Sequence, residues 1–195
     1  MHKSINCIVT GVGGQGTILA SKLIAQTAIR LGKPARTAET IGMAQRGGSV
    51  VSHVRIGAAF SPLIPLSGAD LILGFEPGET VRVLPYLKDG GLVIAANTVI
   101  QPVMASLTGQ AYSGEAMLDY LREHVGRLAV VDTEQICADC GSARVINTAL
   151  LGYAAASGVL GFGLAELEEE VRQSVKSRYV EMNITAMRAG ADFAG

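Results

Sequence analysis

The sequence predicts an α/β fold: a three-layer α/β/α arrangement around a mixed, mostly parallel sheet, with a Rossmann-like first strand, loop and helix. Short apolar, β-branched runs alternate with segments of helical period along the chain, which is typical of such layers. A glycine loop follows the first strand and opens a helix. The strand expected at 49–56 has no helical crossover before it, which favours antiparallel pairing there and hence a mixed sheet. No linker or internal repeat interrupts residues 1–195, so we expect one domain.

The amino-terminal elements have the clearest signals. Residues 5–10 form a short β-branched apolar run that predicts a strand. A helix is expected at 17–31, because apolar residues recur there at helical spacing and Gly32 and Pro34 follow. A weak second strand is expected at 35–40.

The remaining elements follow the same alternation to the end of the chain. Further strands are expected at 49–56, 70–75, 91–96 and 128–131. Further helices are expected at 76–87, 114–125, 134–139, 143–156, 164–175 and 177–189. Pro85 should disturb the first of these helices. Asp89-Gly90 predicts a turn before the strand at 91.

Charge and composition narrow the class of protein. The chain has 16 Lys and Arg residues and 17 Asp and Glu residues. Basic residues are therefore not in excess, and the charge does not indicate a nucleic-acid partner. Charged residues make up 17% of the chain, against about 25% in soluble proteins on average. With 49% hydrophobic residues, this deficit indicates an apolar surface that another subunit covers.

The sequence predicts a cytoplasmic protein with no membrane association. The amino terminus shows no signal-peptide cleavage pattern. Residues 145–165 carry no charge, but their glycines break the stretch into a helix and a turn, so a buried helix is expected rather than a membrane span. The three cysteines are expected to stay reduced.

The first glycine loop fits the spacing G-x-G-x-x-G through Gly11, Gly13 and Gly16. Such a loop exposes backbone N–H groups at a helix amino terminus, where they favour an anion such as phosphate. A dinucleotide site also needs an acidic residue at the end of the second strand, and Glu39 stands slightly late for that role. Arg36 would instead suit a 2′-phosphate. A stand-alone NAD(P)-binding oxidoreductase is therefore one alternative, and a tight turn packed against a neighbour is another.

Two motifs extend beyond the glycine spacing. The first is GVGGQG at 11–16, and the second is ETIGMAQRGGSVVSHVR at 39–55. Supporting segments are ADLILGFEP at 69–77, NTALLG at 147–152 and YVEMN at 179–183. Together they resemble the gamma-domain family of 2-oxoacid:ferredoxin oxidoreductases and, within it, the beta subunits of the indolepyruvate type. The resemblance covers nearly the whole chain.

The resemblance implies an enzyme subunit that is not active alone. Such enzymes decarboxylate a 2-oxoacid with thiamine diphosphate and magnesium, pass electrons through iron–sulfur clusters to ferredoxin, and form an acyl-CoA. In the indolepyruvate type these groups belong to a larger alpha subunit. Indolepyruvate or another aryl pyruvate is the expected substrate, while pyruvate, 2-oxoglutarate and branched-chain oxoacids stay open.

The residues favour the same division of labour. A ferredoxin-type cluster needs four cysteine thiolates, and this chain has three cysteines. The Gly-Asp-Gly motif of thiamine enzymes is absent, and Asp89-Gly90-Gly91 is better interpreted as a turn. Cys137 and Cys140 have acidic neighbours that disfavour a thiolate, so we expect ordinary helix cysteines. No catalytic residue and no metal ligand is predicted in this chain.

We expect any ligand-binding residues to come from the two motifs. The predicted set, for CoA, another anion or an interface, is Gly11, Gly13, Gly14, Gln15, Gly16, Gln45, Arg46, Gly47 and Gly48. The strand at 49–56 should place Val51, His53 and Arg55 on one face. That face could also meet an anion, although a structural histidine is the preferred interpretation of His53.

Overall fold

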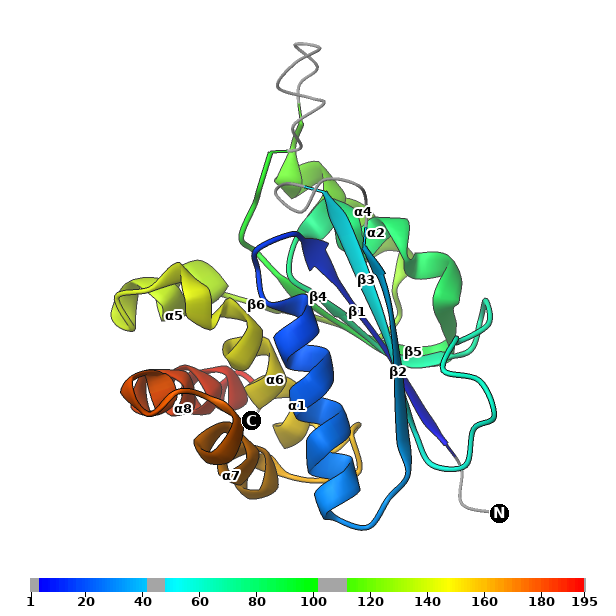
Figure 1. Cartoon of the computed structure of the whole chain (residues 1–195). Coiled ribbons are helices and arrows are strands. Elements are labelled where there is room, and N and C mark those ends of the chain that lie inside the picture. Colours follow the sequence, from blue (N-terminus) through cyan, green and yellow to red (C-terminus); the bar gives the residue numbers. More distant parts are fainter. Residues whose placement is uncertain (1–3, 42–47, 102–111, 195) are drawn as a thin grey trace.

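The computed structural model describes residues 4–41, 48–101 and 112–194. Its centre is a 6-stranded sheet in the order β2-β3-β1-β4-β5-β6 (Figure 1). The strands are β1 (Ile5–Val12), β2 (Ala35–Ile41), β3 (Ser49–Ile56), β4 (Ala69–Gly74), β5 (Leu87–Ala96) and β6 (Leu128–Val131). Helices lie on both faces, which confirms the predicted three-layer α/β/α fold.

The sheet is mixed, as predicted. β3 runs antiparallel to both of its neighbours, from Ile5↔Ile56 to Val12↔Ser49 with β1, and from Ala35↔Ile56 to Ile41↔Val50 with β2. The pairs β1–β4, β4–β5 and β5–β6 are parallel. The carboxyl ends of these four strands therefore meet at one edge of the sheet, below called the carboxyl edge.

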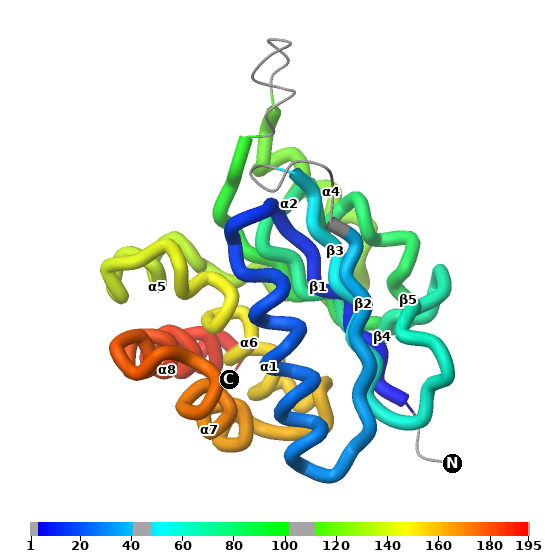
Figure 2. The backbone as a smooth tube through the Cα atoms, viewed as in Figure 1, coloured from blue at the N-terminus to red at the C-terminus, as the bar shows by residue number. Residues whose placement is uncertain are grey.

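The helices divide into two unequal layers. They are α1 (Thr17–Arg30), α2 (Pro77–Arg82), α4 (Gly114–His124), α5 (Thr133–Asp139), α6 (Ile146–Ala156), α7 (Leu164–Ser174) and α8 (Ser177–Asp192). Helices α1, α6, α7 and α8 lie on one side of the sheet, and α2 and α4 lie on the other (Figures 1 and 2). Two buried clusters, one on each side, form the core.

Three predicted elements differ from the observed ones. The helix expected at 76–87 ends at Arg82, and Pro85 lies in a separate 3-10 turn, Leu84–Tyr86. The helix expected at 143–156 begins with a 3-10 turn, Ala143–Val145. The Asp89-Gly90 turn was wrong as a boundary: both residues lie within β5, where Gly90 has φ +70° and the pairing with β4 shifts register. The bulge accommodates the turn-forming pair without ending the strand.

The uncharged stretch around α6 is buried inside the protein. α6 packs on α8, and most of its side chains are inaccessible to solvent. Among the described residues, we find no helix with the length and apolar character required to cross a membrane.

Candidate functional site

The glycine loop lies at the carboxyl edge, between the end of β1 and the start of α1. Gly13 donates its N–H to the carbonyl of Gly48 over 2.8 Å, so the two sequence motifs are adjacent in space. Gly14 is exposed with φ +107°, and Gly16 has φ +85° as the N-cap of α1. Both conformations favour glycine.

The amino terminus of α1 has the electrostatics of an anion site. Gly16 supplies no side-chain cap, and the first turn of α1 contains no acidic residue. The first intrahelical bond comes from Ala20 N–H to Gly16 O at 3.0 Å. The N–H groups between Gly16 and Ala20 therefore have no partner within the helix, and they form the positive end of the helix dipole.

Gln15 has a structural position, although its backbone belongs to the loop. Its side-chain Oε1 accepts a hydrogen bond from Val12 N–H at 2.7 Å, and its Nε2 donates to Phe75 O at 2.7 Å. The side chain is buried and joins the end of β1 to the end of β4. Its amide is occupied within the protein, so any contribution of this side chain to the predicted anion site is indirect.

The loop also packs against α6. A Cβ at Gly16 would come within 2.5 Å of Asn147 Nδ2, so a side chain there would displace the Asn147 amide and would also be strained by the positive φ. The next residue of α6 is Thr148, and its Oγ1 lies 3.1 Å from Asn183 Oδ1 of α8. The segments NTALLG and YVEMN therefore support the glycine loop together. Sequence reasoning found both segments but not this contact, because nothing in their spacing indicates a partner so far away in the chain.

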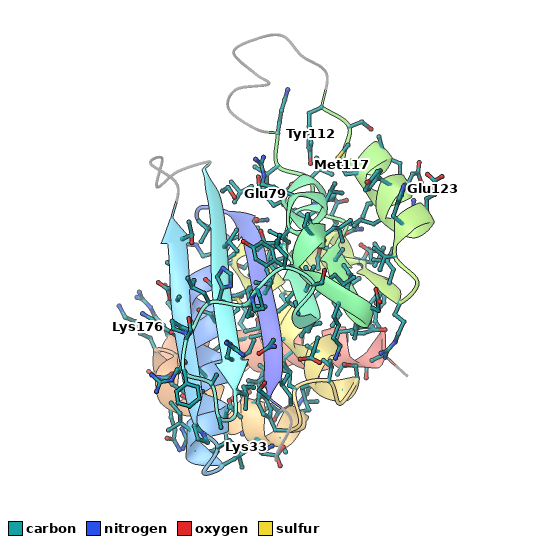
Figure 3. All side chains as sticks on the ribbon, turned by 90° about the vertical axis from the view of Figure 1, so that its right-hand side faces the viewer. Lys33, Glu79, Tyr112, Met117, Glu123 and Lys176 are labelled. Carbon is teal, nitrogen blue, oxygen red and sulfur yellow. The ribbon has the colours of Figure 1, made fainter. Side chains whose placement is uncertain are left out.

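A buried carboxyl group lies next to the loop, and sequence reasoning missed it. Glu76 follows Phe75, is 2% exposed, and caps α2 by accepting Glu79 N–H at 2.9 Å. Tyr112 donates its hydroxyl hydrogen to Glu76 Oε1 and accepts Gly78 N–H at 3.0 Å. Figure 3 shows Tyr112 and Glu79 close together above the sheet. Burial raises the pKa of the Glu76 carboxyl, and these hydrogen bonds only partly offset that rise.

The raised pKa of Glu76 gives a prediction for stability against pH. A carboxyl group whose pKa rises on folding binds its proton more tightly in the folded state. Its stabilising contribution is therefore complete below its ordinary pKa of 4.5 and is lost as the pH rises through the folded value. We expect the free energy of unfolding of the wild type, relative to that of Glu76→Gln, to decrease as the pH rises from 4.5 through the raised pKa of the folded state. Urea unfolding of both proteins at matched pH values measures it, and a difference that stays constant or grows would contradict the assignment.

A family model described as pyruvate ferredoxin/flavodoxin oxidoreductase matches residues 6–193. The chain belongs to the pyruvate ferredoxin/flavodoxin oxidoreductase family.

Two relatives in this family match this chain over most of their own length. Indolepyruvate oxidoreductase subunit IorB of Archaeoglobus fulgidus is 37% identical over 95% of this chain and 93% of its own. The pyruvate/ketoisovalerate oxidoreductases common subunit gamma of Thermococcus kodakarensis is 30% identical over 90% and 89%. By family, the chain is thus a small subunit of a 2-oxoacid:ferredoxin oxidoreductase complex.

Solved structures have the same fold. Pyruvate oxidoreductase subunit PORC of Thermotoga maritima superposes with a TM-score of 0.73 at 20% identity, covering 97% of this chain and 96% of that one. The 2-oxoglutarate:ferredoxin oxidoreductase of Magnetococcus marinus gives 0.73 at 18% identity, but there the match covers 100% of this chain and 31% of that chain. The family fold therefore also occurs as part of a longer polypeptide.

The structure describes only part of the second motif, residues 39–55. Gly48 contacts Gly13, as described above, whereas Gln45, Arg46 and Gly47 lie outside the described residues.

Strand β3, which forms the second half of this motif, has the predicted faces but not the suggested role. Arg55 pairs with Asn6 at the start of β1, so it lies at the opposite end of the strands from the glycine loop, and the suggestion that it meets an anion there is wrong. His53 is a structural histidine, as predicted: its Nδ1 accepts Ile64 N–H at 3.2 Å, and its ring meets Tyr86 edge-on. Burial lowers the pKa of His53, which favours the neutral ring.

The strand order of this chain differs from that of a Rossmann dinucleotide site. In a Rossmann site the acidic residue comes from the strand next to β1. Here β3 lies between β1 and β2, and Glu39 is exposed on the outer strand, opposite Ser52.

Cys137 and Cys140 lie in and after α5, and burial raises the pKa of both thiols, so neither is an activated thiolate. Within the ranges that the structure describes, no group of three His, Cys, Asp or Glu residues has the arrangement of a metal site.

Proposed function

We propose that this chain is the small subunit of a thiamine-dependent 2-oxoacid:ferredoxin oxidoreductase that acts on indolepyruvate or another aryl pyruvate. The observation that carries the proposal is the 37% identity to an indolepyruvate oxidoreductase subunit over nearly the full length of both chains. Identity to a pyruvate/ketoisovalerate subunit is lower, at 30%. In this account the complex forms an acyl-CoA and carbon dioxide from the oxoacid and CoA, and two electrons pass to ferredoxin.

The redox chemistry in this proposal belongs to a larger alpha subunit. That partner would hold thiamine diphosphate, magnesium and the iron–sulfur clusters. The three cysteines of this chain support the division, because a cluster of the ferredoxin type takes four thiolates. The small subunit would contribute binding and positioning, and it would not turn over an oxoacid alone.

The carboxyl edge is our candidate for the part of this chain that serves the active site of the complex. Its backbone N–H groups at Gly14 and Gly16 and the dipole of α1 favour a phosphate or carboxylate. The predicted ligand is the phosphate region of CoA, with Arg46 as a neighbouring cation. Gln15 and Glu76 would act through the shape of the loop, since both are buried and hydrogen-bonded within the protein.

The substrate assignment is tested with the reconstituted complex and a panel of 2-oxoacids. We expect kcat/KM for indolepyruvate or phenylpyruvate to exceed that for pyruvate and 2-oxoglutarate by at least about 10-fold, roughly the discrimination that a pocket shaped for an aromatic ring supplies. A preference for pyruvate or a branched-chain oxoacid would contradict the aryl-pyruvate assignment while leaving the family role intact.

The CoA role has its own measurement. Calorimetry of CoA binding to the complex should show weaker binding for Arg46→Ala, by roughly 1.5–3 kcal/mol if a charge-assisted hydrogen bond is lost. Arg127→Ala is the matched control, because Arg127 follows α4 at the other end of the sheet, where its Nη1 donates to Gly90 O. Equal CoA affinity in the two variants would exclude a direct contact by Arg46.

A further inference from the structure

The loop between β3 and β4, residues 57–68, exposes large apolar side chains. Phe60 is fully exposed at 104%, Leu66 at 66% and Leu63 at 55%. The loop contains no charged residue. Apolar side chains gathered on an exposed segment are typical of an interaction surface.

Hydrogen bonds from side chains of β3 hold this loop in its conformation. Arg55 Nη1 donates hydrogen bonds to Ser61 O at 3.0 Å and Leu63 O at 3.3 Å. Ile64 donates its N–H to the buried ring of His53 and places its own side chain in the core, at 3% exposure. A loop that is already ordered loses little conformational entropy when a partner docks on it.

Two arginines stand beside the apolar loop without a compensating carboxylate. Arg36 and Arg55 are direct cross-strand partners in the β2–β3 ladder, an arrangement that is destabilising for like charges. Arg36 also donates its Nε–H to Ala59 O at 2.8 Å, next to Phe60. Over the described part of the chain, neither guanidinium has a carboxylate within 4.0 Å, since neither forms a salt bridge. A partner with acidic groups would supply the missing charge.

The surroundings leave room for a partner. Figure 3 views the sheet from the side away from α1, and there α2 and α4 lie to the right while no helix of the described residues stands in front of β2 and β3. The glycine loop lies at the other end of β1, because Arg55 pairs with Asn6 and the glycines follow Thr10. The loop surface is thus separate from the carboxyl edge.

We propose that the exposed side chains of this loop, together with one neighbouring arginine, form a docking surface for the larger subunit of the same complex. The residues are Phe60, Leu63, Leu66 and Arg36. On the larger subunit they would meet an apolar depression rimmed by carboxylates. The inference rests on the proposed function and adds to it which surface joins the two chains. Charge complementarity to the two arginines selects an acidic rim.

The test is the affinity of the full chain for its purified partner subunit. We expect Phe60→Ser/Leu63→Ser to raise the Kd at least about 30-fold and Arg36→Glu at least about 10-fold, as for central apolar and rim-charge positions of an interface. Ile29→Ser and Lys22→Glu are the controls, because they make the same kinds of change on α1 at exposed positions. Both controls should stay within about 2-fold. The Phe60→Ser/Leu63→Ser variant and both controls should unfold at the wild-type temperature, since the altered side chains are exposed. Arg36→Glu should unfold at the wild-type temperature or above it, because it replaces the repulsion with Arg55 by an opposite-charge pair.

The outcomes separate this inference from the function on which it rests. If the wild-type chain does not assemble into a complex that oxidises a 2-oxoacid, the proposed function fails. If the wild type assembles an active complex and the loop variants bind with unchanged Kd, the docking surface is wrong and the function stands. If the loop variants lose only self-association in sedimentation, the surface joins two copies of this chain and the proposal is overturned.

Discussion

Gly152→Ala should destabilise the chain by roughly 3 kcal/mol or more, at the upper end of what one added methyl group costs in a packed core. A Cβ at Gly152 of α6 would overlap the carbonyl group of Met187 in α8, and a Cβ at Gly190 of α8 would overlap the carbonyl group of Ala149 in α6. The two helices therefore touch backbone to backbone at two points. No rotamer change relieves such an overlap, so the helices would have to separate and lose packing along their length.

The control for this prediction makes the same change where space is free. Gly126 is exposed, has no positive φ, and nothing lies within 4 Å of a Cβ built there. Gly126→Ala should change the free energy of unfolding by no more than about 0.5 kcal/mol. Urea unfolding of the three proteins measures both effects, and equal stabilities would show that α6 and α8 are not in backbone contact.

Gln15→Ala should cost roughly 2–4 kcal/mol, because it leaves two buried backbone groups, Val12 N–H and Phe75 O, without hydrogen-bond partners. The substitution also removes the link between the ends of β1 and β4 that gives the glycine loop its shape. We therefore expect a loss of activity in the reconstituted complex at temperatures where the variant is still folded. Thermal unfolding, together with assays well below the transition, separates the two effects.

Two comparisons sharpen the Gln15 prediction. Gln135→Ala removes an exposed side chain that, among the described residues, bonds only Asp139, so it should stay within about 0.5 kcal/mol of the wild type. Gln15→Glu keeps the acceptor for Val12 N–H but turns a carboxylate oxygen toward Phe75 O, so it should be at least as harmful as the alanine variant. If Gln15→Ala were as stable as Gln135→Ala, the side chain would not be the support we describe.

The sequence predicted the parts of the fold whose signals are local. β3 and β6 have the predicted bounds, because the residues of β3 alternate as expected for a strand and β6 is a short apolar run that ends before Asp132-Thr133. The mixed sheet followed from the missing crossover before residue 49. The start of β5 could not be predicted, because Asp89-Gly90 has the same composition whether it forms a turn or a bulge, and only the pairing with β4 decides between them.

The candidate site was predictable in place but not in detail. The glycine spacing located the loop at the end of β1, and the adjacency of Gly13 and Gly48 agrees with the joint use of the two motifs. The position of the Gln15 side chain depends on Phe75, sixty residues later, and the burial of Glu76 depends on Tyr112. Both are long-range contacts, so spacing within one motif carries no information about them.

The division of roles between the two subunits is tested by ferredoxin reduction with indolepyruvate and CoA, measured for this chain alone, for the larger subunit alone and for the two together. We expect no turnover by this chain, full turnover by the mixture, and a partner that carries all of the iron, acid-labile sulfide and thiamine diphosphate. Turnover by this chain in the absence of the larger subunit, or iron–sulfur clusters bound to it, would contradict the central claim that its role is binding and positioning.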